Sequence, residues 1–79
     1  MDKQVLYSLI TCSNTVINLL IEQYNCGRID FAIFKQHVEL KIDFLNRHLD
    51  SISDMDLRNS IIHTIEKCSE ILTPSNARQ

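Results

Sequence analysis

The sequence predicts an all-α fold, a three-helix up-down-up antiparallel bundle in which a long helical hairpin is followed by a third helix. Three observations support this prediction. The 79 residues include only one glycine and one proline, and these residues are the usual punctuation of turns and β-hairpins. Apolar side chains recur every three or four residues, as they do on one face of a helix. The links between the periodic segments are short, which favours antiparallel neighbours.

The length allows one domain, residues 1–79, with a small core. Such a core hardly accommodates a deep ligand cavity, so we expect any binding site to be a surface groove or an interface. The same reasoning leaves open a bundle that is completed by dimerisation. Residues 73–79 are expected to form a frayed tail, because Pro74 disfavours helical geometry just before it.

The first helix is expected over residues 3–25, with Gly27 in the left-handed position that often ends a helix. It carries two neighbouring rows of mostly apolar residues. One row is Leu6, Ile10, Ser13, Ile17, Leu20 and Tyr24, and the other is Val5, Leu9, Cys12, Val16 and Leu19. The opposite face is polar and consists of Thr11, Asn14, Thr15, Asn18 and Glu22. Because the apolar face is wider than one packing partner requires, we expect this helix to contact two others.

The second helix is expected over residues 30–49, with Asp30 as its N-cap and a hydrophobic staple between Ile29 and Phe34. Its main stripe is Phe31, Phe34, Val38, Ile42, Leu45 and Leu49. The third helix is expected over residues 54–72, after a capping box that begins at Ser53. Its apolar face is Leu57, Ile61, Ile65, Cys68 and Leu72.

The second helix has a further stripe, which is the sharpest functional signal in the sequence. It consists of Ile33, His37, Leu40 and Phe44, and Lys41 and His48 separate it from the main stripe. An aligned row of exposed apolar residues indicates an interaction site. We therefore predict that a partner binds at Ile33, His37, Leu40, Lys41 and Phe44. The alternative is that the wide face of the first helix covers both stripes, which would make them core.

Catalytic, metal and cofactor sites are not expected. The three cysteines and three histidines are far apart in sequence, whereas a zinc site usually takes its ligands in close pairs. We expect Cys12 and Cys68 to be buried apolar residues. No Gly-rich turn or paired acid indicates an enzyme.

We also expect no nucleic-acid partner and no membrane partner. We expect a cytoplasmic location. A net charge of −2 gives no basic surface for phosphates. In a helix-turn-helix protein, the third helix would contact DNA bases through Arg58, Asn59, His63 or Lys67. Neighbouring acidic residues offset the positive charge of these side chains. The start of the chain lacks the features of a signal peptide, and the longest apolar runs are shorter than a membrane span.

These observations together predict a non-catalytic interaction module. It would be a regulator, adaptor or inhibitor that binds another protein through apolar helix faces and could also bind a second copy of itself. Two alternatives remain open. One is a secretion-type or folding chaperone that holds an amphipathic client segment, and the other is a small DNA-binding transcriptional regulator.

Overall fold

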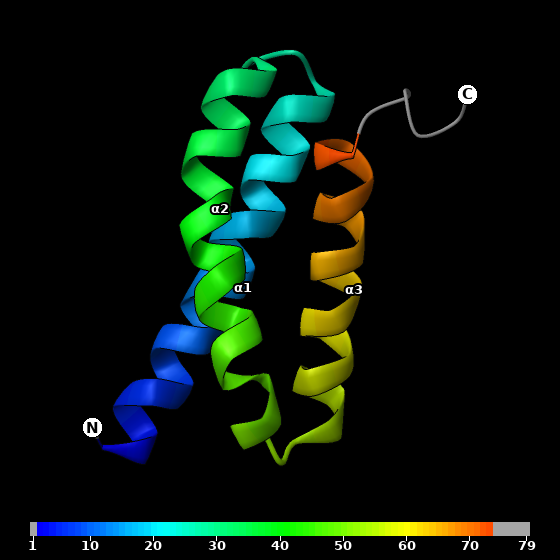
Figure 1. Ribbon diagram of the computed structural model, residues 1–79. Helices are drawn as coiled ribbons and strands as arrows, with labels where there is room; N and C mark the ends of the chain where they lie inside the picture. The colour runs from blue at the N-terminus through cyan, green and yellow to red at the C-terminus, as the bar shows by residue number, and fades with distance from the viewer. Residues whose placement is uncertain (1, 74–79) are drawn as a thin grey trace.

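A computed structural model describes residues 2–73 and shows the predicted three-helix bundle. The helices are α1 (Lys3–Asn25), α2 (Phe31–His48) and α3 (Met55–Leu72), and a short 3₁₀ turn, η1 (Leu49–Ser51), follows α2. In Figure 1 the chain runs up through α1, down through α2 and up again through α3, which confirms the predicted topology. The frayed tail predicted at residues 73–79 lies, from residue 74 onward, outside the described residues.

The turn between α1 and α2 has the predicted left-handed glycine. Gly27 has φ of 78°, and its N–H donates to the Tyr24 carbonyl while the Arg28 N–H donates to that of Gln23. These bonds satisfy carbonyls at the end of α1 that have no partner within the helix. Asp30 then caps α2 by accepting a hydrogen bond from the Ile33 N–H at 2.9 Å. The chain therefore reverses direction within a few residues and forms the helical hairpin.

The start of α3 differs from its prediction by one residue. The Asp54 carboxylate, and not Ser53, accepts hydrogen bonds from the N–H groups of Asp56 and Leu57. Asp54 has the extended backbone that an N-cap requires. A carboxylate at this position also interacts favourably with the positive end of the helix dipole, which a serine hydroxyl does not match.

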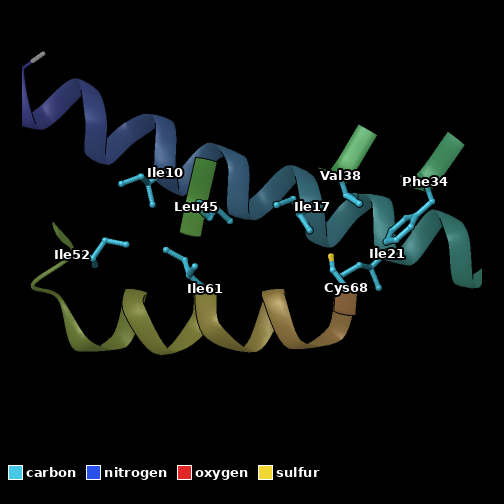
Figure 2. Packing of buried hydrophobic residues seen from close by; sticks show 9 residues of the cluster. All are labelled: Ile10, Ile17, Ile21, Phe34, Val38, Leu45, Ile52, Ile61 and Cys68. Carbon is cyan, nitrogen blue, oxygen red and sulfur yellow. The ribbon is translucent and has the colours of Figure 1, made fainter. Parts of the chain in front are cut away.

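The core lies along the line where the three helices meet (Figure 2). It consists of Ile10, Ile17, Ile21, Phe34, Val38, Leu45, Ile52, Ile61 and Cys68. The α2 members belong to the predicted main stripe, and Tyr24 packs beside Phe34 with 5.1 Å between ring centroids. Ile29 also packs against this core, in agreement with the position expected for the staple residue.

The contact between α1 and α3 is more polar than the sequence predicts. Asn14 and Asn18, which were expected on the polar outer face of α1, lie against α3. Asn14 Nδ2 donates to Ser60 Oγ at 3.2 Å, and Asn18 Nδ2 donates to Thr64 Oγ1 at 3.0 Å. α1 does contact two helices, as predicted, but this polar row is part of its contact with α3. The helical period identifies faces without showing which of them a third element will cover.

Helix α1 is long and apolar enough to cross a membrane, judged by length and composition alone. Its most apolar window has a mean hydropathy of 1.4. The core helix of a water-soluble protein meets the same criterion when it is mostly buried, whereas only 22% of this window of α1 is buried. Length and composition therefore do not decide whether α1 contacts a membrane, and the absence of a membrane partner stays a prediction.

Candidate protein-binding surface

The second apolar row of α1 faces away from the core. Val5, Leu9 and Leu19 are about half exposed, at 48%, 44% and 53%. Cys12 is exposed, which corrects the prediction that it is buried. α3 could have covered this row only by packing on the opposite side of α1, away from Asn14 and Asn18. The surplus of apolar surface that the sequence shows on α1 is therefore left at the protein surface.

The further stripe of α2 is also uncovered over most of its length. Leu40 is 78% exposed and Ile33 is 42% exposed, and His37 is exposed as well. Phe44 is half-buried, because one side of its ring packs against the core. Its other neighbour is the His48 ring, 4.9 Å away between centroids. The wide face of α1 therefore leaves Ile33 and Leu40 unburied.

These two surfaces meet in a shallow groove of about 270 Å³ between the outer sides of α1 and α2. We call it the hairpin groove. It is lined by Leu9, Ser13, Leu40, Lys41 and Phe44. Three of the five predicted partner-binding residues thus lie together. His37 and Ile33 lie one and two turns further toward the start of α2, outside the lining.

Sequence reasoning missed the contribution of Leu9 and Ser13. Leu9 was placed in an apolar row of α1 that was expected to pack inside the bundle. The regular spacing of that row was the available signal. It gives α1 an apolar face that is wider than contact with the two neighbouring helices requires. Only the position of α3 shows that Leu9 lies beside Leu40 and not in the core.

Lys41 is the charged member of the hairpin groove. Its side chain is half-buried, and its Nζ donates to the His37 carbonyl at 3.1 Å. An ammonium group has three donor protons, so two remain available to a partner. No carboxylate among residues 2–73 forms an ion pair with it. The groove therefore combines apolar walls with one cation at its edge.

The cysteines and histidines form no metal centre within the part of the chain that the structure describes. No group of three or more histidine, cysteine, aspartate or glutamate side chains lies close enough to hold an ion. Cys68 is buried, as predicted. Burial raises the pKa of its thiol from 9.0 to about 11, and the nearby Lys67 ammonium opposes part of this change. A thiol with so high a pKa is a poor nucleophile near neutral pH.

The side chains considered for base contacts are partly engaged within the bundle. Arg58 donates to the Leu49 carbonyl at 3.2 Å and lies 3.7 Å from the Asp50 carboxylate. Lys67 donates to Asn18 at 3.3 Å. Both cations thus make contacts within the bundle, and the absence of a nucleic-acid partner stays a prediction.

A second hollow, of about 580 Å³, lies between α1 and α3. Its lining mixes polar residues, among them Asn14, Asn18 and Lys67, with the apolar residues Leu19 and Ile21. The Asn18 amide and the Lys67 ammonium already bond to each other there. This bond links α3 to α1 at the edge of the hollow.

Comparison with known proteins finds no matching protein-family model, no matching curated protein and no matching solved structure.

Proposed function

We propose that this protein is a non-catalytic interaction module that regulates or adapts another protein by binding it through the outer face of the α1–α2 hairpin. The observation that supports the proposal most directly is the exposure of Leu40, at 78%. Leu40 does not stand alone, since Leu9 and Phe44 adjoin it in one groove. Contiguous apolar surface of this kind is typical of protein-binding sites, whereas single exposed apolar residues are ordinary.

The shape of the surface supports a helical or extended partner over a small molecule. The hairpin groove is shallow and open, whereas small-molecule sites usually enclose most of their ligand. Two helices that lie side by side present ridges with a groove between them, which is the geometry that receives an amphipathic helix. The proposed function therefore needs no cavity, cofactor or catalytic residue.

Site-specific photo-crosslinking followed by binding measurements with the purified partner tests the proposal. A photoreactive amino acid placed at position 40 should capture a protein in the native cell that the same group at position 55 does not. Met55 is a suitable control position, because it is also exposed, at 62%, but lies at the start of α3. The captured protein is then purified and titrated against the wild-type chain and two variants.

Leu40→Asp is expected to weaken binding of the captured protein by about tenfold to a hundredfold, because burial of one leucine contributes about 1.5–3 kcal/mol. Met55→Asp is expected to leave binding unchanged, and circular dichroism should show full helicity in both variants. Equal capture from positions 40 and 55, or binding that Leu40→Asp does not weaken, would overturn the proposal.

A further inference from the structure

Building on the proposed function, we propose that the hairpin groove binds an amphipathic α-helix of another protein, and that an acidic residue beside the apolar row of this helix pairs with Lys41. The inference thus names the class of partner and the charge it must carry. It rests on the distribution of charge around the groove, on the shape of the α1–α2 surface and on the consequence of docking two copies face to face.

The charges of α2 separate into two groups. Lys35 lies 3.9 Å from Glu39, Arg47 pairs with Asp43, and none of these four residues lines the groove. Each of these four charges is thus paired with an opposite charge on α2. Lys41 lies on the groove side, and no carboxylate of residues 2–73 pairs with it. Lys41 is thus the cation of α2 that has room for an acid from outside.

Helix α1 supplies no compensating charge along the groove. No charged residue occurs between Lys3 and Glu22 in the sequence, and the groove residues of α1 are Leu9 and Ser13. The lining therefore holds one positive charge and no negative charge. An exposed ion pair contributes little in water, but a charge at the edge of an apolar contact selects partners and orients them. The complementary partner has an apolar row with an acidic neighbour.

The lining of the hairpin groove covers about one turn of each helix. On α1 it extends from Leu9 to Ser13, which corresponds to about 6 Å at 1.5 Å per residue. Leu40 and Phe44 on α2 are four residues apart, so they form a ridge along one side of the groove. A helix with apolar residues at positions i, i+3, i+4 and i+7 would place them between the two helices.

A second copy of this chain is a poorer occupant of the groove. Symmetric docking of two hairpin grooves brings together two linings that each contain one positive charge and no negative charge. Like charges at such a contact oppose association, and no acid of the groove lining offsets them. An acidic helix from another protein removes this repulsion and replaces it with attraction. Self-association through the groove is therefore an outcome that the experiment must be able to reveal.

The experiment uses two synthetic helical peptides of about four turns that share the same row of leucines. One peptide has glutamate beside the row and the other has lysine at the same positions. Fluorescence anisotropy measures the binding of each to the wild-type protein and to the variants Lys41→Glu and Lys35→Glu. Lys35→Glu is the matched control, because Lys35 is also a lysine of α2 but lies in the Lys35–Glu39 pair and does not line the groove.

The wild-type protein should prefer the glutamate peptide by about threefold to fivefold, as expected for one partly exposed ion pair. Lys41→Glu should reverse the preference, and Lys35→Glu should retain it. Leu40→Asp should weaken both peptides. A lack of preference, or an equal reversal in the two lysine variants, overturns the inference. So does a wild-type dimer, seen by sedimentation, that Leu40→Asp dissociates.

Binding measurements with the captured natural partner distinguish failure of this inference from failure of the proposed function. If Leu40→Asp weakens the captured protein but Lys41→Glu does not, the groove binds a partner without the acidic contact, and only this inference fails. If neither variant weakens the captured protein, the proposed function fails as well.

Discussion

Asn14 lies between α1 and α3, 8% exposed, with its Nδ2 bonded to Ser60. Its Oδ1 is buried and has no hydrogen-bond partner among the described residues. Asn18, one turn later, is in the opposite situation. Its Nδ2 donates to the main-chain carbonyl of Asn14 and to the Thr64 hydroxyl, and its Oδ1 accepts from the Lys67 ammonium. Two asparagines on the same row of α1 therefore differ in how fully their polar atoms are bonded.

Asn14→Leu is expected to raise the free energy of unfolding by about 1 kcal/mol. It removes a buried acceptor that has lost its bond to water, and a buried polar atom without a partner costs about 1–3 kcal/mol. The hydroxyl of Ser60 remains accessible to water, because Ser60 is exposed. Urea unfolding followed by circular dichroism measures the change.

Asn18→Leu is the matched control for this prediction and should lower the free energy of unfolding by about 1 kcal/mol, since it removes bonds that are made. A destabilised Asn14→Leu would contradict the prediction. It would mean that the bond from Asn14 to Ser60 contributes more than the unpartnered oxygen costs.

At the scale of the element, the ends of the helices decide how the bundle is connected. α1, α2 and α3 each begin with an aspartate whose carboxylate accepts a backbone N–H, at Asp2, Asp30 and Asp54. Gly27 ends α1 with a positive φ that other residues rarely adopt. These local signals explain why the helix bounds in the structure agree closely with those predicted from the sequence.

Asp54→Ala is expected to lower the free energy of unfolding by about 1 kcal/mol, the usual loss when an N-cap side chain is removed. Ser53→Ala should change it by no more than about 0.5 kcal/mol, because Ser53 is exposed and makes no cap bond. Urea unfolding of the two variants measures both values. A larger effect at Ser53 than at Asp54 would restore the capping box that the sequence suggested.

At the scale of the whole molecule, the burial of Cys68 links the stability of the bundle to pH. The thiol has a pKa of about 11 in the folded protein and 9.0 without burial. Below pH 9 the thiol is protonated in both the folded and the unfolded chain, so its titration does not change the free energy of unfolding there. Between these values the unfolded chain loses the proton while the folded chain keeps it. The free energy of unfolding therefore falls as the pH rises.

Comparison of the wild-type protein with Cys68→Ala isolates this contribution. Cys68→Ala should be less stable at about pH 8, because it removes a buried side chain, and the difference should narrow at about pH 10.5. Other groups that titrate in this range affect both proteins alike. A difference in unfolding free energy that stays constant across the range would contradict the prediction.

The candidate surface was only partly predictable from the sequence. The stripe from Ile33 to Phe44 follows from its spacing, and the exposure of Leu40 agrees with it. Leu9 and Cys12 were expected inside the bundle, yet they are exposed. The helical period shows that α1 has two apolar rows and a polar face, but not which of them α3 covers.

The sequence by itself determined the number of helices, their bounds, their antiparallel order and the core stripe of α2, because these depend on local period, caps and short links. Only the tertiary structure decided that α3 packs on the Asn14 and Asn18 side of α1. In this arrangement α3 buries Ile61 and Cys68 in the core and bonds to α1 through Ser60 and Thr64, which are more than forty residues away in sequence. Local period does not encode contacts between residues so far apart. By covering the polar face, α3 leaves the second apolar row of α1 exposed beside Leu40, and the hairpin groove exists for this reason.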